Sequence, residues 1–246
     1  MVSLLQLQAH QTSPDVDRVH YCCRQSLNLY NASMQGLVTQ AAAGRYLRVV
    51  SLPDVPPGTS PGAIEVCLCE DDYPGWLAIA DLEHLDLAAI PYRTIALAET
   101  DISSRVHGAI AFAQAAMAQP NHYLWGGTVA PNYDCSGLVQ AAFASVGIWL
   151  PRDAYQQEAF TQAIALSDLL PGDLVFFGSP AKATHVGLYM GDGCYLHSSG
   201  KDQGRNGIGI DRLSAEGDRV SQTYYAQLRG AGRVVASYQS RCSSLR

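Results

Sequence analysis

The sequence is poor in charge, and poorest in lysine. Charged residues make up 15% of its 246 residues, against about 25% in an average soluble protein, and Lys182 and Lys201 are its only lysines. Hydrophobic residues make up 48%, which argues against a disordered chain. The net charge of −6 argues against a nucleic-acid binder, because phosphate contacts require clustered Lys and Arg.

Long apolar runs are also missing. Asp134 is the only charged residue between Val106 and Pro151. Prolines, glycines and polar residues interrupt that stretch, so it lacks the roughly 18 consecutive apolar residues of a membrane span, and we expect a buried segment instead. Residues 1–17 show no basic n-region and no long apolar h-region. We therefore expect no signal peptide, and a cytoplasmic protein.

Cysteines are odd in number and scattered, and a chain of this length does not need disulfides. We expect most of them to be reduced. Cys67 and Cys69 alternate as in a strand, so both thiols share one face, but a C-x-C pair alone makes a poor zinc site. We expect them to pack in the core, and we expect no metal or organic cofactor. The sequence assigns no role to Cys22, Cys23, Cys67 or Cys69.

Negative charge gathers between Arg48 and Arg93, where no other basic residue occurs. The eight acids of this stretch are Asp54, Glu65, Glu70, Asp71, Asp72, Asp81, Glu83 and Asp86. We expect the face that carries them to attract cations.

Turn-forming residues divide the chain into two parts. Up to about Thr94, alternating runs separated by Gly, Pro, Asn and Asp predict a small β-barrel, with strands at 27–30, 36–40, 46–51, 63–69 and 75–80. From Ser103 the apolar period becomes helical. It predicts a helix ending before Pro120, a second from Cys135 to about 147 with Asp134 as its N-cap, and a short third at 154–161. Strands are predicted at 174–177, 184–190, 194–198 and 208–213. Helices followed by a sheet indicate an α+β domain.

Cys135 is the strongest candidate for chemistry, because it falls in the first turn of a predicted helix. Unpaired backbone amides and the helix dipole stabilise a thiolate there, so we expect a thiol with a low pKa that iodoacetamide alkylates rapidly near pH 6. The alternative, that Cys135 is a small buried hydrophobe, stays open from local sequence. Gly137 would allow another backbone to approach closely.

Two histidines are placed to act on that thiol. The Gly191-Asp192-Gly193 turn predicts a hairpin in which His185 and His197 lie nearly opposite each other. One imidazole can take the thiol proton while the other orients it, as in a catalytic triad. Either histidine alone is more typical of a packed or surface residue.

The motifs around these residues resemble those of the NlpC-type cell-wall cysteine peptidases. They are Tyr123-Leu-Trp125-Gly126-Gly127, Asp134-Cys135-Ser136-Gly137, Leu150-Pro151-Arg152, Pro171-Gly172-Asp173-Leu174-Val175-Phe176, Thr184-His185-Val186-Gly187-Leu188-Tyr189 and Leu196-His197, in the family's order. The resemblance implies a papain-like fold with Cys135 as nucleophile, His185 as general base and His197 as the residue that orients it. Tyr123 matches a tyrosine that helps to form the oxyanion pocket. Trp125, Asp134, Ser136 and Arg152 are expected to contact the substrate.

The first part resembles the bacterial Src-homology-3-like domain of cyanobacterial members, through Thr39-Gln40-Ala-Ala-Ala-Gly44 and Glu70-Asp71-Asp72-Tyr73-Pro74-Gly75-Trp76. The resemblance implies that its acidic and tyrosine residues bind the amino group of an N-terminal L-alanine, and Asp72, Tyr73 and Asp81 are our candidates. The alternative is an ordinary solvated acidic loop. For Arg152 the alternatives are a substrate carboxylate and an ion pair with Asp153 or another acid.

Together these observations predict an N-terminal arm (1–16), an SH3-like barrel (17–95), a papain-like catalytic domain (96–240) and a tail (241–246). The activity that the resemblance implies is that of a γ-D-glutamyl-L-diamino-acid endopeptidase, which cuts murein peptides carrying a free N-terminal L-alanine during recycling. We expect the protein to be a monomer. The alternatives are a non-catalytic peptidoglycan-binding protein and an amidase or acyltransferase on the same fold.

Overall fold

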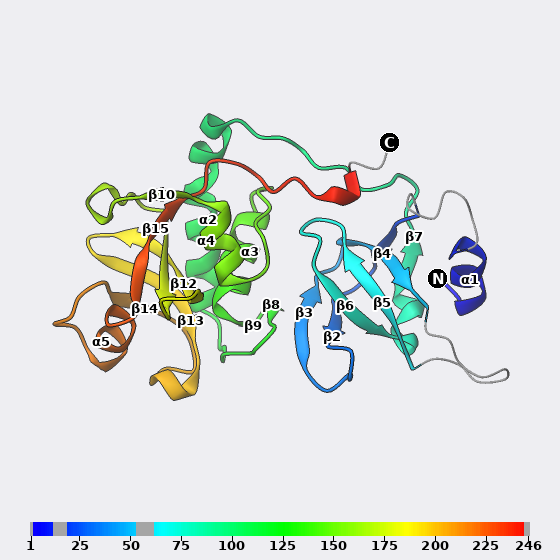
Figure 1. Ribbon diagram of the computed structural model, residues 1–246, viewed down its shortest axis with the longest axis horizontal. Helices are drawn as coiled ribbons and strands as arrows, with labels where there is room; N and C mark the ends of the chain where they lie inside the picture. Colours follow the sequence, from blue (N-terminus) through cyan, green and yellow to red (C-terminus); the bar gives the residue numbers. More distant parts are fainter. Residues whose placement is uncertain (1, 12–18, 53–61, 244–246) are drawn as a thin grey trace. The chain divides into compact units, whose positions relative to one another are not determined.

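The computed structural model describes residues 2–11, 19–52 and 62–243. The chain forms two compact units, one of residues 1–95 with 239–246 and the other of residues 96–238 (Figure 1). Residues 53–61, between the predicted strands 46–51 and 63–69, lie outside the described residues, as do residues 12–18 and the two ends of the chain. Among the described helices, none combines the length and apolar character needed to cross a membrane.

The first unit is built on one antiparallel sheet with the strand order β3-β2-β6-β5-β4-β1-β7. Its elements are α1 (Leu4–Gln11), β1 (Tyr21–Cys23), β2 (Leu27–Tyr30), β3 (Leu37–Ala41), β4 (Tyr46–Ser51), β5 (Ala63–Leu68), β6 (Pro74–Ala78), η2 (Ile79–His84) and β7 (Leu85–Leu87). The alternation that predicted these strands is an alternation of burial, since Leu27 and Leu29 are buried while Asn28 is exposed. All five strands expected in this part are present to within about two residues.

Two features of the first unit were not predicted. The first is the presence of the strands β1 and β7 and the helix α1. All three are short, and β1 and β7 have three residues each, too few for a recognisable period. Residues 239–246, expected to end the catalytic domain and form a tail, belong to the first unit instead. The Oγ of Ser240 donates to Asp72 Oδ1 at 2.7 Å, which ties this segment, including η5 (Arg241–Ser243), to the turn after β5.

Part of the acidic stretch is internal. Arg45 is buried and pairs through Nε with Glu70 Oε2 at 3.1 Å and through Nη2 with Asp71 Oδ1 at 2.9 Å. Burial raises the pKa of Glu70, although Arg45 acts in the opposite direction. The expectation of one acidic face is therefore wrong for these two residues, because their charges are compensated inside the unit.

The second unit combines helices with an antiparallel sheet of order β10-β15-β11-β12-β13-β14, which confirms the expected α+β class. Its elements are α2 (Glu99–Met117), β8 (Thr128–Val129), β9 (Asn132–Tyr133), α3 (Cys135–Ala144), α4 (Ala154–Phe160), β10 (Gln162–Ile164), η3 (Leu166–Asp168), β11 (Leu174–Gly178), β12 (Ala183–Gly191), β13 (Cys194–Ser199), η4 (Lys201–Gln203), β14 (Gly207–Arg212), α5 (Arg219–Tyr225) and β15 (Leu228–Arg233).

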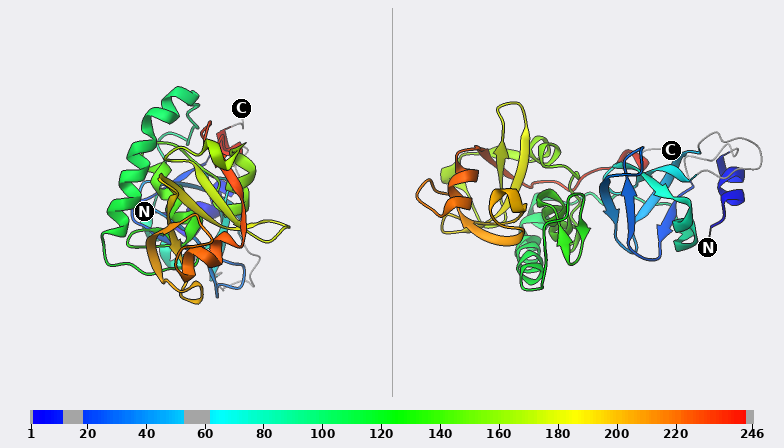
Figure 2. Two further views of the ribbon diagram at one scale, coloured as in Figure 1. Left: turned by 90° about the vertical axis from the view of Figure 1, so that its left-hand side faces the viewer. Right: turned by 90° about the horizontal axis from the view of Figure 1, so that it is seen from below.

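Both faces of this sheet are covered. Leu174 and Phe176 of β11 belong to the core formed with α2 and α3, whereas Val175 and Phe177 pack with Tyr224 of α5. Successive residues of a strand point to opposite faces, so α3 and α5 lie on opposite sides of the sheet (Figure 2). A strand buried on both faces carries a continuous apolar run, and this is why the sequence showed β11 but not which helix covers each side.

The helix α3 is fixed at both ends. Asp134 precedes it as N-cap, as expected, with Oδ1 accepting from the backbone N–H of Gly137 at 2.7 Å. At the other end Gly147 has φ +79° and the N–H of Ile148 donates to the carbonyl of Phe143, which closes the last turn. The first residue of α3, Cys135, is thereby held in one place.

Candidate active site

Cys135 lies where another backbone segment approaches α3. A Cβ added to Gly137 would stand 2.0 Å from the carbonyl oxygen of Gly127, so only glycine fits there, as expected. The N–H of Asp134 donates to that same carbonyl, and Asp134 Oδ2 accepts from the N–H of Gly126 at 2.9 Å. The loop that carries Tyr123 and Trp125 is thus fastened directly to the start of α3.

The thiol of Cys135 is 6% exposed. Burial raises its pKa to about 12, and the charge of Asp134 acts in the same direction. Hydrogen bonds from the backbone N–H groups of Val186 and Ser136 lower it by less. The expected low-pKa thiolate is therefore wrong, because desolvation outweighs the helix N-terminus. The resting side chain is a neutral thiol, and rapid alkylation near pH 6 is not expected of it.

His185 and His197 meet across the hairpin formed by β12 and β13. The strands pair Leu188 with Leu196, so the two histidines are diagonal neighbours and not directly opposite each other. Their rings nevertheless contact, with His185 Nε2 and His197 Nδ1 2.7 Å apart in a T-shaped arrangement. The predicted contact is confirmed, and the predicted register is off by two residues because the chain turns at Asp192 and Gly193, between the paired Gly191 and Cys194, and not about position 191.

The hydrogen-bonded chain continues beyond the two histidines. His197 Nε2 lies 2.6 Å from Oδ2 of Asp211, a buried residue of β14. Arg205 donates to the same carboxylate through Nε at 3.1 Å and Nη2 at 2.5 Å. Although burial raises the pKa of Asp211, the hydrogen bonds from His197 and Arg205 lower it further, so this carboxylate is ionised.

These contacts determine which nitrogen of each imidazole carries a proton. Burial lowers the pKa of His185 and His197, so both rings are neutral at rest. The ionised Asp211 accepts the proton of His197 Nε2, which leaves His197 Nδ1 as an acceptor. His185 Nε2 must then donate to it, and the bare nitrogen of His185 is Nδ1. His185 is thereby prepared as a base, next in sequence to Val186, whose N–H contacts the Cys135 sulfur.

Aromatic rings enclose His185. Tyr224 of α5 stacks on it with ring centroids 4.1 Å apart and an angle of 21° between the ring planes. The hydroxyl of Tyr224 hydrogen-bonds Ser199 Oγ at 2.7 Å, and Phe177 packs against the same imidazole. Stacking restricts rotation of the ring and excludes water, which accounts for its lowered pKa.

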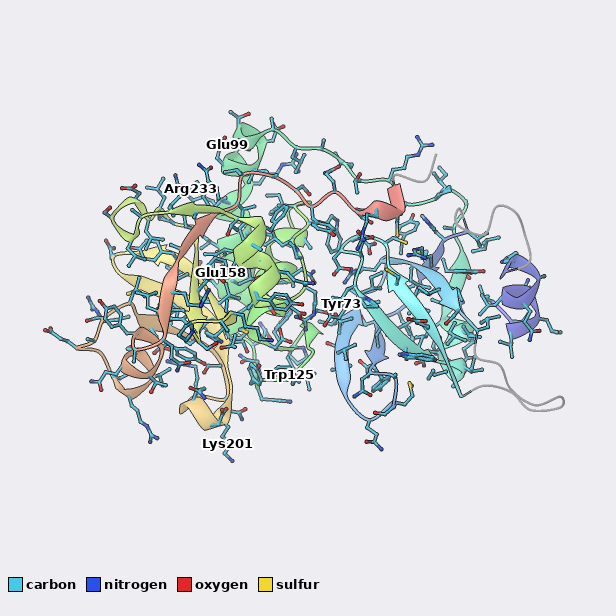
Figure 3. The ribbon with its side chains drawn as sticks, in the orientation of Figure 1. Tyr73, Glu99, Trp125, Glu158, Lys201 and Arg233 are labelled. Carbon is cyan, nitrogen blue, oxygen red and sulfur yellow. The ribbon has the colours of Figure 1, made fainter. Side chains whose placement is uncertain are left out.

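Tyr123 is half-buried near the thiol. Burial raises its pKa, with further contributions from Cys135 and Asp134, so its hydroxyl remains a donor. Trp125, two residues on, is 72% exposed and projects from the loop before β8 (Figure 3). A phenol donor and an exposed indole on one loop are suited to an oxyanion and to a ligand, respectively.

Arg152, Asp134 and Ser136 form a closed cluster. The guanidinium of Arg152 is 1% exposed and binds Asp134 in a bidentate manner, with Nη2–Oδ2 at 2.6 Å and Nη1–Oδ1 at 3.1 Å. Nη1 also donates to Ser136 Oγ at 3.0 Å. Arg152 was expected to bind either a substrate carboxylate or an acid of the protein. The structure shows an ion pair, and its partner is Asp134. These residues support the start of α3 from inside.

We expect Arg152→Leu to lower the free energy of unfolding by about 3–5 kcal/mol, because it leaves the buried carboxylate of Asp134 without its counter-ion. Urea unfolding followed by circular dichroism measures the change. Arg212→Leu is the matched control, since Arg212 is exposed. A loss of less than about 1 kcal/mol in Arg152→Leu would contradict the structural role of the pair.

The candidates for amine binding are residues of the first unit. Asp72 follows β5 in the turn before β6; its Oδ1 accepts from Ser240 Oγ and its Oδ2 from the backbone N–H of Arg241 at 2.8 Å. Tyr73 is the next residue. Asp81 lies in η2, where partial burial raises the pKa of its carboxyl group. Asp72 and Tyr73 are adjacent, and Asp81 comes from a separate element.

Sequence reasoning missed Asp211, Arg205 and Tyr224. Asp211 falls inside the predicted strand 208–213, where an acid directly after Ile210 was a usable signal. What the sequence did not contain is the register, which pairs Asp211 with Tyr195 and so places it beside His197. Tyr224 lies in α5, whose seven residues are too few for a helical period to be recognised.

Comparison with known proteins identifies both units. Residues 120–229 match the model of the NlpC/P60 family, and residues 29–82 match that of the bacterial dipeptidyl-peptidase Sh3 domain. The first match includes Cys135, His185, His197, Asp211 and Tyr224. These matches confirm the resemblances drawn from the motifs and the papain-like and SH3-like assignments.

Several curated relatives share the second unit. A probable endopeptidase of Mycobacterium tuberculosis is 47% identical over 90 residues, which are 36% of this chain and 23% of that protein. The bifunctional muramidase/DL-endopeptidase CwlT of Bacillus subtilis is 46% identical over 81 residues, 31% of this chain and 25% of that protein. The matched region thus spans about a quarter of these relatives. A crystal structure of an NlpC/P60 family protein from Bacillus cereus aligns with 95% of this chain and 67% of that chain, at 20% identity and a TM-score of 0.45.

Proposed function

We propose that this chain, which carries a bacterial SH3 domain and an NlpC/P60 domain, is a cysteine endopeptidase that acts on the peptides of peptidoglycan. One observation carries the proposal, namely the buried chain from Asp211 through His197 to His185, the residue before Val186, whose backbone N–H contacts the sulfur of Cys135 at the start of α3. A core cysteine without a catalytic role would not need two neutral histidines held in one tautomer by an ionised carboxylate.

In the first step His185 Nδ1 takes the proton of the Cys135 thiol as the sulfur attacks the substrate carbonyl. The imidazolium that forms is stabilised through His197 by the charge of Asp211, which stays ionised. Its stabilisation is needed because burial disfavours a charged imidazole in the resting site. The thiolate character that the resting protein lacks thus arises only as the reaction begins.

The negative charge that develops on the carbonyl oxygen requires donors. The hydroxyl of Tyr123 is the candidate, since burial keeps its proton in place. His185 then gives its proton to the leaving amine, and the acyl group remains on Cys135 as a thioester. Water that loses a proton to His185 Nδ1 attacks the thioester and releases the acid and the free thiol.

For the substrate, we propose the bond between γ-D-Glu and a diamino acid in murein peptides that carry a free N-terminal L-alanine. The ammonium of that residue would be bound by carboxylates of the SH3 domain, with Asp72, Tyr73 and Asp81 as the candidates. An ammonium is costly to bury without a partner charge. Such recognition selects peptides already released from the wall, and this is the basis for proposing a role in recycling.

The test compares L-Ala-γ-D-Glu-diaminopimelate with its N-acetylated form, with products identified by mass spectrometry. We expect cleavage after D-Glu, and a fall in kcat/KM of at least about tenfold on acetylation, which is the effect of losing roughly 1.4 kcal/mol of binding. Asp81→Asn should reduce the difference between the two substrates, whereas Glu83→Gln, two residues away and exposed, is the control.

Three other outcomes of this test would each point to a different function. Equal rates on the two substrates would refute amine recognition but leave the peptidase in place. Cleavage or transfer at another bond would indicate an amidase or acyltransferase. Binding of the peptide without turnover would indicate a non-catalytic peptidoglycan-binding protein.

A further inference from the structure

Three thiols and a carboxylate gather inside the first unit, and the catalytic proposal uses none of the thiols. Cys67 lies on β5, Cys69 directly follows it, Asp72 stands in the next turn, and Cys242 comes from the C-terminal segment that returns to this unit. All three cysteines are buried. The Sγ atoms of Cys67 and Cys242 and a carboxylate oxygen of Asp72 all lie within 4.8 Å of one another.

Cys69 is a third thiol near this group, since the side chain of Cys242 contacts those of both Cys67 and Cys69. The Cys69 sulfur is not among the ligand atoms that lie within 4.8 Å of one another, so Cys69 would complete the site as a fourth ligand once its side chain moves closer. Cys242 is therefore the common neighbour of the two thiols that β5 presents on one face. The second partner that the C-x-C pair lacks in the sequence is supplied by a residue more than 170 positions later.

These donors match one kind of metal centre. Zinc is bound at about 2.3 Å by thiolate sulfur and at about 2.0–2.2 Å by carboxylate oxygen, in tetrahedral geometry. Thiolates select zinc over magnesium and calcium, which prefer sites made of oxygen alone. We infer that Cys67, Cys69, Cys242 and Asp72 form a structural zinc site in the SH3 domain. Four protein ligands close the coordination shell, which is typical of structural and not catalytic zinc.

The surroundings of Asp72 orient its carboxylate as a ligand. Ser240 Oγ donates to Oδ1 at 2.7 Å and the N–H of Arg241 donates to Oδ2 at 2.8 Å. Arg241 Nε also stands 3.7 Å from Oδ2. Hydrogen bonds of this kind hold ligating carboxylates in other metal sites.

A guanidinium compensates the remaining charge. Three thiolates, one carboxylate and Zn²⁺ carry a formal charge of about −2, and the guanidinium of Arg48 on β4 interacts with the side chain of Cys242. An arginine beside three buried cysteines has no purpose in simple core packing. Beside a zinc–thiolate centre it neutralises charge and donates to sulfur.

The site would fasten the end of the chain to the barrel. Between Asp72 and Ser240 the chain runs through the whole second unit, so zinc would close a long loop and hold residues 239–243 against the strand that carries Cys67. Metal binding then contributes to the folding free energy of the first unit. This role does not involve Cys135, His185 or His197. It shares Asp72 with the candidates for amine binding, and a carboxylate bound to zinc would leave Asp81 as the acid that binds the ammonium.

The experiment uses the full chain, purified under reducing conditions, loaded with Zn²⁺ and passed through a desalting column with a weak chelator. We expect one equivalent of zinc in the wild-type protein, in Cys194→Ser and in Cys135→Ala, and well below one equivalent in Cys242→Ser. Cys194 is the matched control because it is a cysteine of the second unit, and Cys135→Ala removes the other candidate thiol.

A second measurement does not depend on whether Cys242→Ser folds. Co²⁺ bound to the wild-type protein should show the thiolate-to-metal charge-transfer and tetrahedral ligand-field bands of a site with several sulfur ligands. Their absence, or equal zinc in wild-type protein and Cys242→Ser, would overturn the inference. A disulfide between Cys242 and either Cys67 or Cys69 in non-reducing peptide mapping of the purified protein would overturn it as well.

Discussion

Cys135→Ala is expected to abolish hydrolysis of the murein tripeptide, with kcat reduced by about six orders of magnitude, the size of effect seen when a nucleophile is removed. No other described sulfur has an equivalent position, because the histidine chain ends beside the first residue of α3 alone. The variant should fold, since the substitution removes a single sulfur atom from a small side chain of the core. Steady-state kinetics with product detection by mass spectrometry measure the loss.

Cys194→Ala is the control for this experiment, because Cys194 lies in β13 like His197 but outside the hydrogen-bonded chain. It should keep full activity. Turnover of Cys135→Ala within about tenfold of the wild type, equivalent to no more than roughly 1.4 kcal/mol of barrier, would remove Cys135 from the mechanism and with it the peptidase proposal.

Asp211→Asn is expected to lower kcat by about two to four orders of magnitude, with little change in KM. Asparagine offers one oxygen where aspartate offers two, and Arg205 competes for it. If the amide N–H₂ faces His197, that ring must carry its proton on Nδ1 and donate to His185 Nε2. His185 then holds its own proton on Nδ1, facing the thiol, and cannot act as a base.

The pH profile separates this positioning role from a structural one. Asp211→Asn also removes the charge that stabilises the imidazolium of His185, so the fall in kcat should be present across the pH range and should not be rescued by lowering the temperature. Asp192→Asn, at the exposed turn between β12 and β13, is the matched control and should behave as wild type. An Asp211→Asn enzyme with unchanged kcat but a lowered melting temperature would show that the carboxylate is merely structural.

The resting state of the site also follows from the structure and not from the motif. A cysteine at a helix N-terminus is expected to be a thiolate, yet burial and Asp134 keep Cys135 protonated. Both histidines are neutral for the same reason, since neither ring is exposed enough to hold a charge. The site therefore resembles a serine-protease triad in the protonation states of its residues, with a neutral nucleophile and a neutral base.

Much of this protein could be predicted from local patterns. Alternation of burial marks β2 to β6 without reference to any other part of the chain, and the helical period with Asp134 as N-cap marks α3. Cys135, His185 and His197 followed from a helix start and a Gly-Asp-Gly turn, which are local signals. Short elements such as β1, β7 and α5 escaped because three to seven residues do not establish a period.

The sequence by itself determined the α+β class and the order of the two domains, and it singled out Cys135, His185 and His197 as the candidates for nucleophile and histidine pair, since these signals depend on short local patterns. Only the tertiary structure decided which residues distant in sequence contact each other: Arg152 and Asp134, Asp211 and His197, and Cys242 and Cys67. Such pairs depend on strand register and on where a distant segment returns, and neither is encoded by spacing. Burial likewise decided the protonation of Cys135, because desolvation is a property of the packed molecule.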